Sequence, residues 1–194
     1  MNIPIYNAII TDVNEGIDKI SLVEMPAVES NFIAFANDKQ HLMFSTDEEQ
    51  QMIKGVLMRA DFPIYRNDTQ LGEYYIQFSK ETVKEMAEKL LLDGKHNWVN
   101  IEHLENTVVK GVDMVELFIK DSSKGINPKG FEDISDGSLF ATFKVRNKEV
   151  WECIKQGVFS GFSLEGYFNY ELAEKTEYDE IMDMINKIKN KIGK

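Results

Sequence analysis

The segment Gly161-Phe162-Ser163-Leu164-Glu165-Gly166 places a hydroxyl and a carboxylate between two glycines. Glycines let the backbone approach neighbouring groups more closely than residues with a side chain do. The segment is not the nucleophile elbow of α/β-hydrolases, because its glycine spacing is one residue longer and β-type residues follow it in place of a helix. A serine between glycines in a strand is usually structural, so a catalytic role for Ser163 needs a base that accepts its proton.

His103 is the best candidate for that base. It follows a predicted strand over residues 98–101 and has acidic neighbours, Glu102 and Glu105. A histidine in polar surroundings is more often a plain surface residue. Distance along the chain does not decide the question, since catalytic triads are assembled by the fold from residues in several chain orders.

Other kinds of site find less support. Cys153 is the single cysteine, so the chain has no internal disulfide and no cysteine-based metal site, and we expect a small buried residue there. The histidines His41, His96 and His103 lack the His-Glu-x-x-His spacing of a zinc helix. We therefore expect no metal and no cofactor, and no phosphate-binding glycine motif occurs.

Composition excludes several classes of protein. Of 194 residues, 43% are hydrophobic and 28% charged, enough to bury a core, and the net charge is −11. Such an acidic chain is a poor candidate for binding nucleic acid or for lying on a membrane as a basic helix. The N-terminal residues do not resemble a signal peptide, and no apolar run approaches the ~20 residues that cross a bilayer. We expect a cytoplasmic protein.

Most of the chain reads as short strands. Alternating or β-branched segments bounded by turn residues predict them over 5–10, 19–23, 32–35, 52–58, 73–78, 98–101, 112–120, 139–145 and 161–170. In the strand over 112–120, Val115, Leu117 and Ile119 should share one face and Met114, Glu116 and Phe118 the other. The polar stretches 37–51 and 121–137 are predicted loops.

Three helices are predicted. One begins at the N-cap Ser79, buries Val83, Met86, Ala87, Leu90 and Leu91, and ends at Gly94. A second runs from Asn147 to Gly157, and a third, amphipathic one begins at Thr176. We expect a domain over 1–172 and a separate helix over 173–194. Strand density without βαβ alternation predicts an α+β fold, mainly β, built on a closed β-barrel.

Ordered blocks of the chain resemble the phage prohead maturation serine proteases, in particular their XkdF-like branch. These blocks are Ile20–Val28, Ala60–Arg66, Gly72–Ile76, Phe78–Thr82, Val99–His103, Met114–Glu116 and Val150–Phe168. Each block is weak by itself, but seven in the same order are hard to obtain by chance.

The resemblance implies a fold similar to the herpesvirus assembly proteases, a β-barrel flanked by helices. It implies a serine endopeptidase that cuts scaffold and capsid-associated proteins, and itself, inside the immature prohead in the bacterial cytoplasm. The family's nucleophile falls on Ser163, with Ser160 as the nearby competitor, and its histidine falls on His103. Glu116 matches an acidic position of the family and is our third catalytic residue, while Glu102, Glu165 and a histidine stay open. A homodimer is possible.

Two other functions stay open beside the peptidase. The first is a catalytically silent capsid-assembly or scaffold-binding protein on the same fold, with the C-terminal helix as its contact. The second is a metal-dependent hydrolase that uses His96, His103 and nearby acids.

Overall fold

The computed structural model describes residues 3–26, 45–47, 50–105 and 107–173. The strand predicted over 32–35, the helix predicted from Thr176 and His41 lie outside these residues. The elements, in chain order, are β1 (Ile5–Ile9), β2 (Gly16–Val23), β3 (Ser45–Asp47), β4 (Met52–Met58), β5 (Ile64–Asp68), β6 (Gly72–Gln77), α1 (Lys80–Leu92), the 3-10 turn η1 (Lys95–Asn97), β7 (Val99–Ile101), β8 (Val112–Ile119), the 3-10 turn η2 (Ser122–Lys124), β9 (Leu139–Val145), α2 (Lys148–Lys155), β10 (Gly161–Tyr167) and β11 (Asn169–Leu172).

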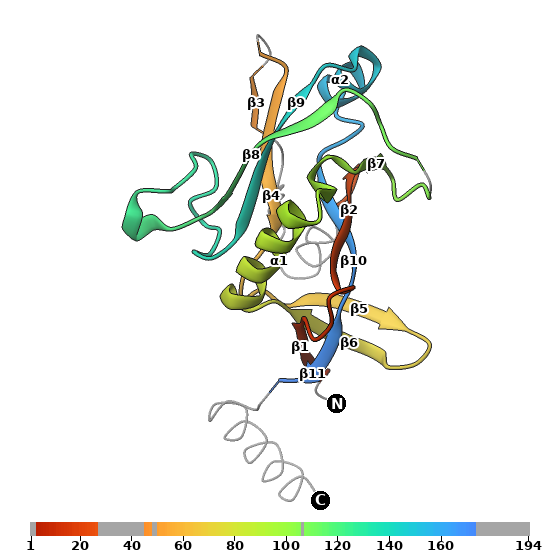
Figure 1. Cartoon of the computed structure of the whole chain (residues 1–194), viewed down its shortest axis with the longest axis vertical. Coiled ribbons are helices and arrows are strands. Elements are labelled where there is room, and N and C mark those ends of the chain that lie inside the picture. The colour runs from red at the N-terminus through yellow and green to blue at the C-terminus, as the bar shows by residue number, and fades with distance from the viewer. Residues whose placement is uncertain (1–2, 27–44, 48–49, 106, 174–194) are drawn as a thin grey trace, which may run out of the picture.

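The strands form three open sheets, with orders β11-β1-β6-β5, β10-β2-β7 and β3-β4-β9-β8. In Figure 1 the first sheet lies below the other two, and α1 crosses in front of the centre. The mainly β prediction is correct, but the predicted closed β-barrel is wrong. A barrel needs an unbroken ladder of hydrogen-bonded strands around its circumference.

The ladder stops between β10 and β4, which lie side by side in different sheets. A strand has two hydrogen-bonding edges. One edge of β4 pairs with β9 along its length, and the start of the other pairs with β3. Asp47, in the acidic stretch that we expected to be a loop, belongs to this short strand β3. Residues of β3 thus occupy part of the edge through which the sheet would have closed.

Both described helices begin where the sequence predicts. Ser79 caps α1 by accepting a hydrogen bond from the Thr82 amide, and Asn147 caps α2 in the same way. Along α1, Val83, Met86, Ala87 and Leu90 are buried as predicted, whereas Leu91 is half exposed. The buried face of α1 packs against β2, so it supports the sheet β10-β2-β7 from one side.

The polar loop predicted over 121–137 is well packed. Phe131 and Ile134 join Val56 and Phe140 in a small second core. The buried ammonium group of Lys120 donates to the carbonyl oxygens of Phe131, Glu132 and Ile134, which anchors the loop to the end of β8. The end of this loop is therefore anchored in the core of its sheet through two residues, while most of its other residues are exposed. No helix among the described residues is long and apolar enough to span a membrane.

Candidate active site

The antiparallel pair β10–β2 positions Ser163 and Glu165. Ser163 lies opposite Ser21, and Glu165 lies opposite Lys19. Directly opposed residues of an antiparallel pair project from the same face, as do residues two apart on one strand. The four side chains therefore share a face, and the ion pair of 3.8 Å between Lys19 Nζ and Glu165 Oε2 agrees with this.

The two glycines of the segment allow β10 to take this position. A Cβ atom on Gly166 would lie 2.2 Å from the carbonyl oxygen of Gly16, and one on Gly161 would lie 2.7 Å from the Pro26 ring. Gly166 also stands at a β-bulge that follows Glu165. The close backbone approach predicted from the sequence is thus a physical requirement at both glycines.

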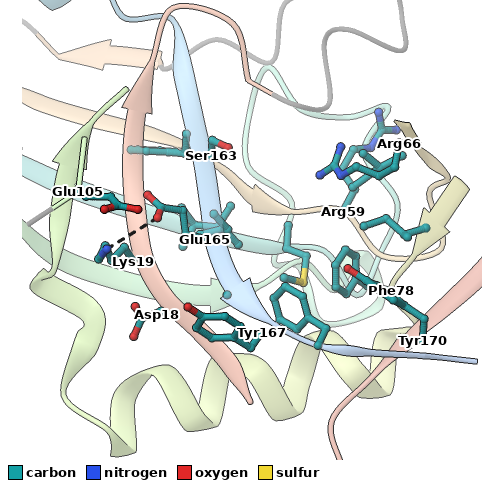
Figure 2. A pocket seen from close by; sticks show the side chains of 18 residues that line it. Asp18, Lys19, Arg59, Arg66, Phe78, Glu105, Ser163, Glu165, Tyr167 and Tyr170 are labelled. Atoms are coloured by element: carbon teal, nitrogen blue, oxygen red, sulfur yellow. Dashed lines mark ion pairs between the residues drawn. The ribbon is translucent and has the colours of Figure 1, made fainter. Parts of the chain in front are cut away.

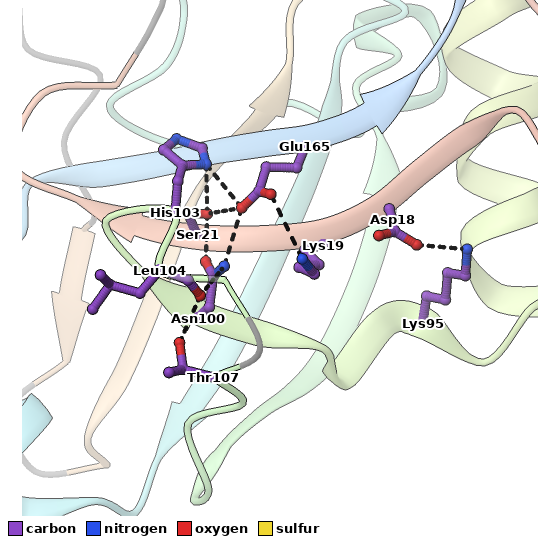
Figure 3. Close-up of polar contacts among 9 residues, drawn as sticks. All are labelled: Asp18, Lys19, Ser21, Lys95, Asn100, His103, Leu104, Thr107 and Glu165. Atoms are coloured by element: carbon purple, nitrogen blue, oxygen red, sulfur yellow. Dashed lines mark hydrogen bonds and ion pairs between the residues drawn. The ribbon is translucent and has the colours of Figure 1, made fainter.

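His103 reaches the same face from β7. This strand runs parallel to β2, with Asn100 beside Ser21 and Ile101 beside Leu22. The chain then turns sharply, because Glu102 and His103 both adopt left-handed backbone conformations, with φ of 48° and 56°. Consecutive non-glycine residues in this region are strained, and such strain concentrates at functional sites. Here the turn brings the imidazole back over Ser21 (Figure 3).

Four side chains, Ser21, Asn100, His103 and Glu165, form what we call the Glu165 cluster (Figure 3). Oε1 of Glu165 lies 2.9 Å from His103 Nδ1, 3.0 Å from Asn100 Nδ2 and 3.2 Å from Ser21 Oγ. Ser21 Oγ in turn lies 3.0 Å from His103 Nδ1 and 2.5 Å from Asn100 Oδ1. A carboxylate against one imidazole nitrogen is how hydrolases orient a catalytic histidine.

Glu165 is held in its charged form. Desolvation by burial raises its pKa, but hydrogen bonds from Asn100, His103 and Ser21 and the nearby His103 ring lower it more, so that the pKa lies below its ordinary value. The side chain of His103 remains 42% exposed. The imidazole is therefore anchored through Nδ1 and accessible to a substrate.

Ser163 lies next to this cluster and lines a pocket of about 430 Å³. Figure 2 shows Ser163, Glu165 and Lys19 on one side of the pocket and Arg59 and Arg66 on the other. Among the described residues, no hydrogen bond engages the Ser163 hydroxyl, whereas Ser160 Oγ donates to the Glu24 carbonyl. Ser163, although only 9% exposed, thus has a hydroxyl without a hydrogen-bond partner among the described residues, whereas that of its competitor is engaged.

Glu116, predicted as the third catalytic residue, lies elsewhere, on β8. Its carboxylate accepts a 2.5 Å hydrogen bond from Thr142 Oγ1 and pairs with Lys54 Nζ at 3.2 Å. The prediction that it shares a face with Phe118 agrees with their register opposite Thr142 and Phe140 on β9, but the prediction for Met114 is wrong, because the bulge before Glu116 sets Met114 opposite Phe143 on the other face. The structure therefore brings Glu165, one of the alternatives left open, to His103, and pairs Glu116 with a lysine.

The remaining candidates lie in other surroundings. Glu102 accepts a hydrogen bond from the Glu24 amide at 2.6 Å. His96 lies in η1, and the described residues contain no group of three or more potential ligands that could hold a metal ion. Ser21 and Asn100 were missed by the sequence analysis, since a serine and an asparagine inside short strands give no signal of their own.

A family model described as "Putative phage serine protease XkdF" matches residues 39–171. The chain belongs to this family. It has no match among curated proteins or solved structures. Family membership makes the protein a phage serine protease, and the matched range includes the turn after β7, which carries His103, and the strands β8 and β10, which carry Glu116 and Ser163.

Proposed function

We propose that this phage serine protease cleaves scaffold and capsid-associated proteins, and itself, during prohead maturation, with Ser163 as nucleophile, His103 as general base and Glu165 as the acid that orients His103. The observation that carries the site assignment is the 2.9 Å contact between Glu165 Oε1 and His103 Nδ1 beside Ser163. Immature proheads in the bacterial cytoplasm would be its place of action.

The proposed chemistry is acyl transfer. With Nδ1 held by Glu165, Nε2 of His103 is the nitrogen that takes the Ser163 proton when a bound peptide draws the two groups together. Ser163 Oγ attacks the peptide carbonyl, and the imidazolium returns the proton to the leaving amine. Water then repeats the cycle on the acyl-enzyme. The Glu165 carboxylate stabilises the imidazolium in both halves.

Ser21 also contacts His103, so it needs to be compared with Ser163 as the nucleophile. Ser21 is completely buried, and its hydroxyl donates to Asn100. Its contact is with Nδ1, the nitrogen that Glu165 already engages. Ser163 lines the pocket instead. Ser163 is therefore favoured as the nucleophile. It lines the pocket, and because Nδ1 of His103 is engaged by Glu165, Nε2 is the nitrogen left to accept its proton.

The test combines a serine-directed fluorophosphonate with co-expression of the full chain and the scaffold and major capsid proteins of its phage. We expect labelling on the peptide that contains Ser163, and scaffold cleavage that Ser163→Ala abolishes. Ser160→Ala is the matched control and should retain both, because Ser160 contacts only backbone.

Scaffold cleavage at the parental rate by Ser163→Ala, or labelling at Ser21, would overturn the site assignment. A protein that stays unlabelled and leaves the scaffold intact in assembled proheads would instead be the silent assembly or scaffold-binding protein.

A further inference from the structure

Ser21 and Asn100 are buried polar side chains with no role in the acyl transfer described above. Both are fully buried, and they lie side by side on β2 and β7. The backbone ladder already joins these strands, so the side-chain contacts are not needed for pairing. Buried polar side chains must find partners, and these two find them in the Glu165 cluster.

The orientation of the Asn100 amide follows from its surroundings. Nδ2 faces two acceptors, Glu165 Oε1 at 3.0 Å and the Leu104 carbonyl oxygen at 3.3 Å, while Oδ1 faces the Ser21 hydroxyl at 2.5 Å. A flipped amide would place Oδ1 against both acceptors, which is unfavourable. Asn100 therefore donates to Glu165 and to Leu104, and it accepts from Ser21.

This orientation fixes the direction of the contact between Ser21 and His103. Ser21 has one proton, and its acceptors are Asn100 Oδ1 at 2.5 Å and Glu165 Oε1 at 3.2 Å. Either choice leaves a lone pair of Ser21 Oγ facing His103 Nδ1 at 3.0 Å. Nδ1 thus faces two acceptor oxygens, Ser21 Oγ and Glu165 Oε1, and must carry the proton itself.

We propose that Ser21 and Asn100 are positioning residues that hold neutral His103 as the Nδ1–H tautomer and Glu165 in place, so that Nε2 presents its lone pair to Ser163. This inference rests on the proposed function. It adds that the histidine is set by two buried side chains from neighbouring strands as well as by the acid. Neither residue contacts the substrate in this account.

The first measurement needs no variant. Imidazole ¹⁵N shifts of the full chain, with His103 assigned from the spectrum of His103→Gln, report which ring nitrogen bears the proton at neutral pH. We expect the Nδ1–H tautomer. A neutral His103 that carries its proton on Nε2 would overturn the proposal even if no variant of Ser21 or Asn100 folded.

The second measurement compares Ser21→Ala, Asn100→Asp and the matched control Thr142→Val, which removes a buried hydroxyl that donates to Glu116. Ser21→Ala should lower kcat roughly tenfold to a hundredfold with KM unchanged, since misplacing a catalytic group by about 1 Å costs on that order. Asn100→Asp sets a second acid beside the cluster, so the acidic limb of the kcat/KM profile should move to higher pH. Thr142→Val should change neither quantity.

Parental kcat and an unchanged pH profile in both folded variants would overturn the positioning role. This result is distinct from failure of the proposed function, which would appear as continued cleavage by Ser163→Ala. Fluorophosphonate labelling of Ser163 in wild type, with loss of kcat in Ser21→Ala, supports both proposals together.

Discussion

Two glutamates of this protein have closely similar surroundings and different capabilities. Glu165 on β10 and Glu116 on β8 each lie within hydrogen-bond distance of a hydroxyl on a neighbouring strand, lie near a lysine and stand beside a β-bulge. The pKa of each carboxyl lies below its ordinary value. They differ in the nitrogen that approaches closest. It is the His103 ring for Glu165 and the Lys54 ammonium for Glu116.

That nitrogen determines what each carboxylate can do. A lysine stays protonated through the neutral range, so its pair with Glu116 serves the sheet surface. A histidine can take up and release a proton in this range, so a carboxylate beside it can support proton transfer. An acidic residue in a strand thus becomes a catalytic candidate when another segment of the chain places beside it a group that can exchange a proton.

Neutralising each acid in turn is the most direct test of the difference between Glu165 and Glu116. Glu165→Gln should lower kcat by on the order of 10²- to 10⁴-fold, because the amide neither stabilises the imidazolium nor enforces the tautomer. Glu116→Gln should stay within about threefold of wild type, since its partners are Thr142 and Lys54. The measurement is kcat on a scaffold-derived substrate. Equal losses in the two variants, or a larger loss in Glu116→Gln, would restore Glu116 as the third catalytic residue.

A second prediction concerns the bulge beside each glutamate. Gly166→Ala should destabilise the fold by roughly 1–3 kcal/mol, because the new Cβ would meet the Gly16 carbonyl oxygen at 2.2 Å and backbone cannot move aside cheaply. Val115, next to Glu116, is 52% exposed, so Val115→Ala should change stability by no more than about 0.5 kcal/mol.

Urea unfolding with intrinsic fluorescence measures both changes. Similar stabilities of Gly166→Ala and wild type would mean that β10 does not need the close approach that we assign to it. Activity of Gly166→Ala should fall along with stability, since Glu165 immediately precedes the bulge.

Local signals in the sequence were enough for the two described helices and most strands. Ser79 and Asn147 carry their capping preference wherever the rest of the chain lies, and the apolar, aromatic and β-branched residues over 139–145 indicate a strand locally. Whether the sheet closes into a barrel could not be predicted from local signals, because closure depends on which strand pairs with the second edge of β4. The answer lies in Ser45–Asp47, a polar stretch without any strand signal.

The candidate site likewise contains residues that the sequence indicates and residues whose placement depends on strand register. Ser163 and His103 were predicted from family blocks, and the close approach at the glycines around Ser163 from their chemistry. The acid that contacts His103 could not be predicted, because Glu102, Glu116 and Glu165 are equally acidic, and only the register of β10 on β2 and of β7 on β2 decides which one meets the imidazole. Ser21 and Asn100 depend wholly on that register.

The smallest expected effect is on stability at acidic pH. It distinguishes the interactions that lower the pKa of Glu165 from those that lower the pKa of Glu116. A carboxyl whose folded-state pKa is depressed stabilises the fold above its unfolded-state value, about 4.3, and loses that contribution as pH falls through the folded value. Both Glu165→Gln and Glu116→Gln should therefore flatten the acid side of the profile of unfolding free energy against pH.

Salt should distinguish the two variants. The pKa of Glu116 is lowered by hydrogen bonds from Thr142 and from Lys54, a partly exposed cation that salt screens. For Glu165, burial raises the pKa, and among the opposing hydrogen bonds the one from the neutral, buried Asn100 is the largest. Urea titrations between pH 3 and 6 at about 0.05 and 0.5 M NaCl should show that salt shrinks the difference between wild type and Glu116→Gln and leaves that for Glu165→Gln nearly unchanged. A difference for Glu165→Gln that disappears in salt would mean that Coulombic attraction to His103 and Lys19, and not the hydrogen bond from Asn100, keeps this carboxylate charged.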